Sequence, residues 1–258
     1  MRGICTTCNL VSVLYICIPA YNEAPTVGLL LWRLRSVMQE FAREYEIIVY
    51  NDGSTDATAE TLKSYQEVLP LTVIPGEVHR GYGHALGVLA REVSRRTRYP
   101  RRDAMVTMQA DFTDRPEDLP ELIKRFEGGA DVVVSERQPN AAWPKPARLL
   151  RRIAPMLTKP FVQVPGIADP YGTLRAYRIS VIRDLVKDSS ETSLLRTDGW
   201  AANVEFLVRA AKYSRRIEPV SGSPRYELRP RETRVRPWSG AVALFRSARA
   251  LRGVAQPS

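Results

Sequence analysis

The first half of the chain alternates short apolar runs with segments whose apolar residues recur at helical spacing. Short, continuous, β-branched runs predict buried strands, and the spacing between them predicts helices. The expected strands are Val13–Pro19, Glu46–Tyr50, Leu71–Ile74, Ala104–Met108 and Ala130–Ser135, and the expected helices cover 25–41, Asp56–Leu69, Gly83–Arg95 and Pro116–Phe126. This order is typical of an α/β fold with a mainly parallel sheet that has helices on both faces.

A polar, turn-forming cluster follows each of the first four expected strands. The clusters are PAYNE (19–23), NDGSTD (51–56), HRGYGHA (79–85) and QADFTD (109–114). Ligands of open parallel sheets bind outside the carboxyl ends of the strands. The four clusters therefore predict one shared site at that edge of the sheet.

The charge of the chain is positive and unevenly distributed. Among 258 residues, 38 are Lys or Arg and 28 are Asp or Glu, a net charge of +10. Residues 137–168 hold six basic residues and no acidic one, and residues 225–252 hold eight arginines against two glutamates. Such stretches favour an anionic partner: a phosphorylated substrate, an acidic lipid or nucleic acid. No helix-turn-helix, RNA-recognition or zinc-finger pattern is present, so we expect no nucleic acid.

The three cysteines, Cys5, Cys8 and Cys17, exclude a disulfide scaffold and suit a reducing compartment. The Cys5–Cys8 pair has no second pair to complete a zinc site. No apolar run approaches the roughly 20 residues that span a bilayer, and the first 20 residues make a poor secretory signal. We expect a cytoplasmic protein that contacts a membrane only at its surface.

The motifs PAYNE and YNDGSTD (50–56) are together the most specific signal. With them, the chain from Leu14 to Arg236 resembles family 2 glycosyltransferases, in particular the polyprenyl-phosphate (dolichyl-phosphate) mannose and glucose synthases. The resemblance implies an A-type glycosyltransferase fold, which binds a nucleotide sugar.

The same resemblance implies the organisation of the chain. We expect one glycosyltransferase domain over residues 1–258. Its nucleotide-sugar-binding half would be 14–136, its acceptor-binding half 137–236, and its C-terminal amphipathic segment 237–258.

In the resembling family, the acid at position 52 contacts the base of the nucleotide. The nucleotide-binding residues implied in this chain are Pro19, Ala20, Tyr21, Glu23, Asp52, Arg80, Gly81 and Ala110. Two glycines before a helix, as in HRGYGHA, permit close approach of the backbone to a ligand. A single histidine is more often a packing or surface residue, so we expect no catalytic role for His79 or His84.

Gln109-Ala110-Asp111 stands where the family has an Asp-x-Asp metal motif. Two carboxylates there hold Mg²⁺ or Mn²⁺, which prefer oxygen ligands, against the diphosphate. Gln109 and Asp111 are therefore the expected metal ligands. The amide of Gln109 leaves the affinity for metal open: its carbonyl oxygen could bind, or Asp114 could replace it. Asp114 could instead cap the helix that begins at Pro116.

In the second half, residues 169–177 (DPYGTLRAY) resemble the family segment Asp-x-x-Ser-Gly-Phe-Arg-Ala-Tyr. The catalytic residues implied in this chain are Asp111, Asp169 and Arg175, and the acceptor phosphate would be bound by Arg137 and by Arg229, with Arg231 as the alternative. Arg148, Arg151 and Arg152 are expected to face the anionic membrane. Glu205 would orient the acceptor or, as an acid on a helix more often does, bind a neighbouring arginine.

The resemblance implies an inverting transfer of mannose or glucose from GDP-mannose or UDP-glucose to a polyprenyl phosphate. The lipid would be met at the cytoplasmic face of a membrane, directly or through a membrane partner protein. Two alternatives stay open. One is transfer to a soluble or cell-wall hydroxyl, which needs a base and would use Asp169. The other is a catalytically silent nucleotide-binding homologue.

Overall fold

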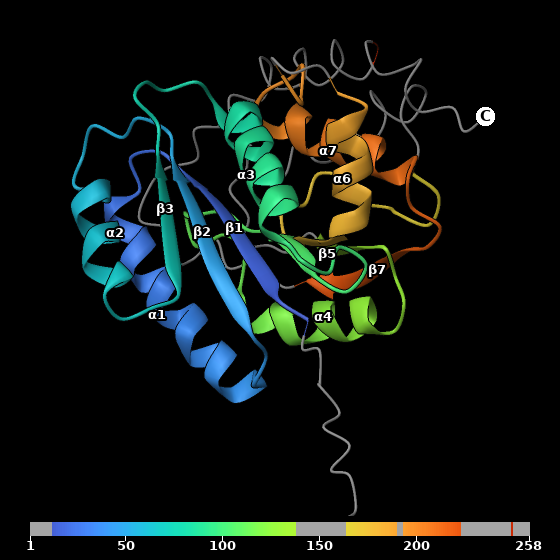
Figure 1. Ribbon diagram of the computed structural model, residues 1–258, viewed down its shortest axis with the longest axis horizontal. Coiled ribbons are helices and arrows are strands. Elements are labelled where there is room, and N and C mark those ends of the chain that lie inside the picture. Colours follow the sequence, from blue (N-terminus) through green and yellow to red (C-terminus); the bar gives the residue numbers. More distant parts are fainter. Residues whose placement is uncertain (1–11, 138–163, 190–192, 223–248, 250–258) are drawn as a thin grey trace, which may run out of the picture.

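A computed structural model describes residues 12–137, 164–189, 193–222 and Arg249. These residues form a single sheet with helices against both of its faces (Figure 1). The strands are β1 (Leu14–Ala20), β2 (Tyr45–Asn51), β3 (Leu71–Pro75), β4 (Ala104–Thr107), β5 (Val132–Arg137), β6 (Arg175–Arg178) and β7 (Ile217–Gly222). Their order in the sheet is β3-β2-β1-β4-β6-β5-β7.

The sheet is mainly parallel, as the sequence predicts. β1 pairs in parallel with both β2 and β4, β2 with β3, and β5 with β7. β6 is inserted antiparallel between β4 and β5, with Thr107 paired to Arg175 and Val134 paired to the same residue from the other side. The carboxyl ends of β1, β2, β3 and β4 therefore meet at one edge.

The helices divide between the two faces of the sheet. They are α1 (Ala24–Phe41), α2 (Thr58–Gln66), α3 (Tyr82–Arg96), α4 (Leu119–Glu127), α6 (Ile179–Lys187) and α7 (Gly199–Ala211), with a short 3₁₀ helix at Pro116–Asp118 before α4. α3, α6 and α7 cover one face, and α1, α2 and α4 cover the other (Figure 1).

β1 shows why the strands are apolar throughout. Tyr15 and Cys17 belong to the core beneath α3 and α7, whereas Ile16 and Ile18 belong to the core beneath α1. Side chains of a strand alternate between faces, so a sheet covered on both faces needs apolar residues at every position.

Two aspartates precede helices and are bonded in different ways. The Asp56 carboxylate accepts hydrogen bonds from the backbone amides of Thr58 (3.1 Å), the first residue of α2, and of Ala24 (3.2 Å), although Ala57 takes the N-cap position of α2. Asp114 does not cap the helix that begins at Pro116. Its carboxylate points towards β4 and β6 instead, where it accepts a hydrogen bond from the backbone amide of Gln109.

The second half holds elements that the sequence analysis did not predict. The helix α6 and the strand β7 were not expected, and the antiparallel direction of β6 was not expected either. Most of the basic stretch 137–168, from residue 138 to residue 163, lies outside the described residues, as does the C-terminal segment apart from Arg249. Among the helices of the described ranges, none combines the length and the apolar character that crossing a membrane requires.

Candidate active site

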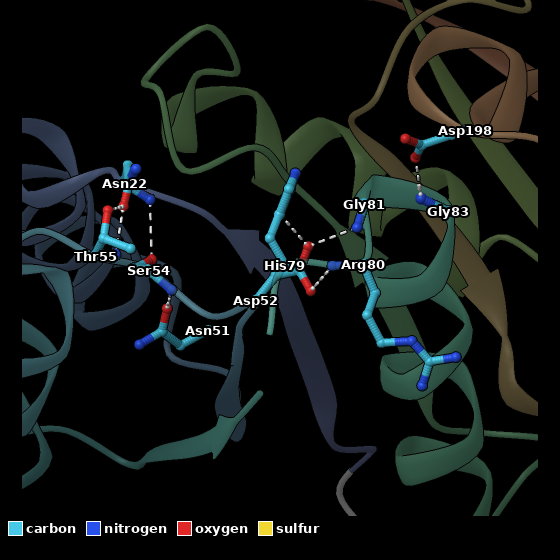
Figure 2. A network of polar contacts seen from close by, with 10 residues as sticks. All are labelled: Asn22, Asn51, Asp52, Ser54, Thr55, His79, Arg80, Gly81, Gly83 and Asp198. Atoms are coloured by element: carbon cyan, nitrogen blue, oxygen red, sulfur yellow. Dashed lines mark hydrogen bonds and ion pairs between the residues drawn. The ribbon is translucent and has the colours of Figure 1, made fainter. Parts of the chain in front are cut away.

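The first two polar clusters are joined by hydrogen bonds at the carboxyl ends of β1 and β2 (Figure 2). The Asn22 amide donates to the Ser54 hydroxyl (2.9 Å), and the Thr55 amide donates to Asn22 Oδ1 (2.7 Å). Asn22 has a φ of 53°, a left-handed conformation that asparagine tolerates better than most residues. The PAYNE and NDGSTD segments are therefore held together at this end of the sheet.

Asp52 connects the end of β2 to the third cluster. Asp52 is only 2% exposed, and its carboxylate accepts hydrogen bonds from the backbone amides of Arg80 (3.0 Å) and Gly81 (2.8 Å). Its Oδ2 also lies 2.8 Å from Nδ1 of His79 (Figure 2). The His79 ring stacks on the Tyr21 ring, with centroids 3.7 Å apart and planes 17° apart. Residues of three predicted clusters thus meet around one carboxylate.

The turn before α3 is held from the opposite side by Asp198. The Asp198 carboxylate accepts a hydrogen bond from the Gly83 amide (2.8 Å), in the first turn of α3 (Figure 2). Gly81 has a φ of 96°, and a Cβ there would lie 2.6 Å from the same carboxylate. A Cβ on Gly83 would lie 2.2 Å from the Thr197 carbonyl oxygen. Both glycines are therefore required for close packing at this point.

Tyr82 and Asn203 link this turn to α7. The Tyr82 hydroxyl donates to Asn203 Oδ1 (3.0 Å). Burial raises the pKa of Tyr82, and the negative charge of Asp114 raises it further, so the phenol stays protonated and able to donate.

Arg175 lies inside the fold, 1% exposed. Its terminal nitrogens donate to the carbonyl oxygens of Asn203 (2.6 Å) and Pro170 (2.7 Å) and to the Tyr177 hydroxyl (3.1 Å). The guanidinium thereby joins β6, α7 and the loop that carries Asp169. In this arrangement it fixes the position of that loop.

The fourth cluster, QADFTD (109–114), forms a turn that folds back against the end of β4. Asp114 is 2% exposed, and its carboxylate accepts hydrogen bonds from the backbone amide of Gln109 (2.9 Å) and from the Thr173 hydroxyl (2.7 Å). Phe112, within this turn, has a φ of 62°, which is unusual for a bulky residue and costs of order 1–3 kcal/mol. Such strain is typical of functional sites, where the surrounding structure enforces it.

Asp111 and Gln109 occupy the expected metal position. Asp111 is 9% exposed and accepts from both the amide and the hydroxyl of Thr113. Within the described ranges, no group of three or more His, Cys, Asp or Glu side chains could hold a metal by itself. Mg²⁺, however, commonly binds one or two carboxylates together with waters and substrate phosphates. One carboxylate and one amide oxygen suit a metal held largely by the donor diphosphate.

Asp169 lies on the loop before β6. Its carboxylate accepts from the Tyr171 amide (3.1 Å). Glu136, at the end of β5, accepts from the amides of Ala168 (2.5 Å) and Asp169 (3.2 Å) and so fixes this loop. The backbone of Arg137 ends β5 opposite Gly222.

Other expected site residues fall outside what the structure describes. These are the side chain of Arg137 and the residues Arg148, Arg151, Arg152, Arg229 and Arg231.

Glu205 has the structural role that the sequence analysis favoured. It is fully buried, forms an ion pair with Arg209 (2.8 Å) and accepts from the amides of Arg196 (3.0 Å) and Thr197 (2.9 Å). It therefore shapes the turn that presents Asp198.

No motif in the sequence pointed to Asp198, Asn203 or Glu136. Asp198 precedes a helix, which is the usual signal of a cap for that same helix. No sequence pattern indicates that it serves α3, 115 residues away.

Comparisons with known proteins agree with this architecture. The family model described as "Glycosyl transferase family 2" matches residues 15–186. The chain is 35% identical over 184 residues to an undecaprenyl-phosphate 4-deoxy-4-formamido-L-arabinose transferase of Pseudomonas aeruginosa, covering 69% of this chain and 50% of the relative. It is 30% identical over 184 residues to the Edwardsiella ictaluri protein of that name, covering 70% and 52%. The chain spans about half the length of the curated relatives it matches.

Solved structures share the fold at low identity. Glucosyl-3-phosphoglycerate synthase from Mycobacterium tuberculosis, in complex with Mn²⁺, UDP and glucosyl-3-phosphoglycerate, has a TM-score of 0.63 at 18% identity, covering 96% of this chain and 81% of that one. Staphylococcus aureus TarS 1–349 in complex with UDP has a TM-score of 0.56 at 18% identity, covering 82% and 59%. The expected A-type glycosyltransferase fold is confirmed, and the chain belongs to glycosyl transferase family 2.

Proposed function

We propose that this chain transfers a sugar from a nucleotide sugar to a polyprenyl phosphate at a membrane surface. The observation that carries this proposal is the relationship to undecaprenyl-phosphate sugar transferases, at 35% identity over 184 residues. The family match over 15–186 spans Asp52, Asp111, Asp169 and Arg175. The same residues lie on the elements that line one edge of the sheet.

The donor's nucleotide would bind where PAYNE, Asp52 and the turn before α3 converge. We assign its binding to Pro19, Ala20, Tyr21, Glu23, Asp52, Arg80, Gly81 and Ala110. The buried Asp52 carboxylate is held rigidly by two backbone amides. A carboxylate held in this way is suited to select a base that presents an N–H group to it. A base without such an N–H group would leave the buried carboxylate short of a hydrogen bond.

A divalent cation, Mg²⁺ or Mn²⁺, would be held by Asp111 and Gln109 at the end of β4. When bound, it neutralises the charge that develops on the leaving diphosphate. Asp111 supplies the charged oxygen, and Gln109 supplies a neutral one. This donor set is weaker than two carboxylates, so the metal should bind together with the donor.

The acceptor phosphate is anionic and already a competent nucleophile, so transfer needs no strong base. Catalysis then rests on positioning and on stabilising charge. Arginine suits this acceptor because its planar guanidinium group can donate hydrogen bonds to two phosphate oxygens at once. We assign this role to Arg137 and Arg229, with Arg231 as the alternative, and assign Arg175 to positioning of the Asp169 loop.

Membrane contact would be peripheral. The stretch 137–168 holds six basic residues without an acidic one, which suits the surface of anionic lipid. Arg148, Arg151 and Arg152 would lie against that surface, on the cytoplasmic face, alone or beside a membrane partner protein. We further propose that the transfer inverts the anomeric carbon and that the donor is GDP-mannose or UDP-glucose.

A second candidate is transfer to a neutral hydroxyl. The observation in its favour is the fixed position of Asp169, whose loop is held by Glu136 and whose carboxylate accepts from the Tyr171 amide. A hydroxyl acceptor needs a general base, and Asp169 would supply it. A third candidate is a silent nucleotide-binding homologue, in which Gln109 has removed metal-dependent transfer.

One transfer assay separates these candidates. Purified chain is incubated with radiolabelled GDP-mannose, UDP-glucose or related donors, and with a short, water-soluble polyprenyl phosphate or the matching alcohol. Labelled product from the phosphate alone supports our proposal, and the anomeric coupling of that product tests inversion. Product from the alcohol at a similar rate supports the hydroxyl candidate. Nucleotide binding by calorimetry without product from either acceptor supports the silent homologue.

A further inference from the structure

The His79 side chain makes the two contacts that a nucleobase would make in the proposed donor site. Its planar ring stacks on the Tyr21 ring, with centroids 3.7 Å apart, and its Nδ1 lies 2.8 Å from Asp52 Oδ2. Tyr21 and Asp52 are also among the residues assigned to the donor's nucleotide under the proposed function, on which this inference rests. The base and the imidazole therefore require the same place.

We propose that His79 is a built-in competitor of the donor's base. The imidazole occupies the base position and rotates out when a nucleotide binds. His79 thereby sets the affinity of this chain for its nucleotide, although it is not needed to hold Asp52 in place.

The loop around His79 is fixed, so only its side chain has to move. The hydrogen bonds from the backbone amides of Arg80 and Gly81 to Asp52 do not involve the imidazole. On the other side, a Cβ at Gly53 would lie 2.6 Å from the Val78 carbonyl carbon and 2.7 Å from the His79 nitrogen. The backbone at this point is thus packed against the β2–α2 turn.

The His79 side chain itself is free to leave. It is 47% exposed, whereas the side chain of its partner Asp52 is 3% exposed. Rotation about the side-chain bonds of His79 would release Asp52 Oδ2 and one face of Tyr21 together. The Asp52 carboxylate would then offer one free acceptor direction to the N–H of a base.

Competition of this kind predicts a gain in affinity when the competitor is removed. If a fraction of the molecules has the site open, the apparent dissociation constant is the intrinsic one divided by that fraction. One partly exposed polar contact and one ring stack hold His79 in the site only weakly, so the site should be open in about 10–30% of molecules. His79→Ala should therefore bind UDP or GDP about three- to tenfold more tightly than the original chain.

Val78→Ala is the matched control. Val78 is adjacent, belongs to the same loop and is 64% exposed. Its substitution should change nucleotide affinity by less than twofold. Calorimetric titration of the three full-length proteins with UDP and with GDP gives the comparison. Weaker or unchanged binding by His79→Ala, while the wild type binds, would overturn the inference but not the proposed function. Failure of all three proteins to bind either nucleotide would contradict the proposed function and this inference together.

Proton NMR provides a second test that needs no substitution at His79. The chain has only two histidines, so the ring protons of His79 can be assigned by comparison with His84→Ala. Stacking on Tyr21 should shift the His79 ring protons upfield. Saturating nucleotide should return them to the positions of an exposed histidine. A further upfield shift would mean that the base stacks on His79 instead of replacing it, and the proposal would be wrong.

Discussion

The carboxylate of Asp198 accepts a hydrogen bond from the Gly83 amide at 2.8 Å, although 115 residues separate the two in the chain. Asp52 holds the preceding amides of the same turn, those of Arg80 and Gly81. Two carboxylates from distant segments therefore fix one short turn at the N-terminus of α3. Negative charge at that end of a helix is also favourable to the helix dipole.

Asp198→Ala should lower the free energy of unfolding by about 1 kcal/mol, because it removes the acceptor for an orphan amide at a helix N-terminus. It should also raise the KM for the donor, since the turn beside Asp52 loses one support. Urea unfolding and donor kinetics measure both effects. Asp184→Ala is the control: its carboxylate is 52% exposed and 4.0 Å from Lys187, and it should change stability by no more than about 0.5 kcal/mol.

Gly83→Ala should destabilise the protein by about 1–3 kcal/mol, because the new methyl group would overlap the Thr197 carbonyl oxygen, 2.2 Å away. Gly87→Ala, in the same helix, is the matched control. There the nearest atom is a Leu194 side-chain carbon at 3.2 Å, and the gain in helix propensity, up to about 1 kcal/mol, opposes the crowding. Equal destabilisation by the two variants would contradict the close packing of α3 against the turn before α7.

Asp52→Asn should raise the KM for the donor more than it lowers kcat. Under our proposal this acid contacts the base, far from the reacting carbon, so it should contribute similarly to the ground state and the transition state. Steady-state kinetics with varied donor concentration provide the measurement. A fall in kcat at unchanged KM would place Asp52 nearer the chemistry than we propose.

Asp111→Ala should abolish transfer while thermal unfolding stays cooperative, because it removes the charged oxygen assigned to the metal. Gln109→Asp should lower the midpoint of a Mn²⁺ titration, since a second carboxylate adds a charged ligand. Both are followed by donor-dependent transfer and by metal binding. Transfer that persists in excess EDTA in the wild-type protein would refute the metal assignment, and an unchanged midpoint would place Gln109 outside the metal's ligands.

Arg175→Lys and Arg229→Lys should both lose transfer activity, but only Arg175→Lys should lower the free energy of unfolding. Lysine has no planar guanidinium group and cannot donate to the carbonyl oxygens of Pro170 and Asn203 together, as Arg175 does. We therefore expect Arg175→Lys to lower the free energy of unfolding by about 2 kcal/mol or more. Arg229→Lys should unfold like the wild type yet transfer poorly to a short, soluble acceptor phosphate. Full activity of Arg229→Lys on that acceptor would contradict bidentate binding of the phosphate.

The sequence by itself determined the α/β architecture and the edge that carries the site. Strand and helix signals are local, because they depend on the spacing of apolar residues within a few turns of chain. A buried parallel sheet forces its strands to read as continuous apolar runs, as in β1. The polar clusters around Asp52 and Asp111 follow those runs directly, so their place at the carboxyl edge could be predicted.

Only the tertiary structure decided which polar groups are bonded within the fold. Arg175 has the residue type and motif of a phosphate ligand, yet its guanidinium is buried against backbone carbonyls. His79 looked incidental in the sequence and lies between Tyr21 and Asp52. The antiparallel β6 and the Asp198–Gly83 bond were equally hidden. These outcomes depend on hydrogen bonds and burial between segments tens to more than a hundred residues apart, and a residue's type and neighbours in sequence do not encode which distant atoms will surround it.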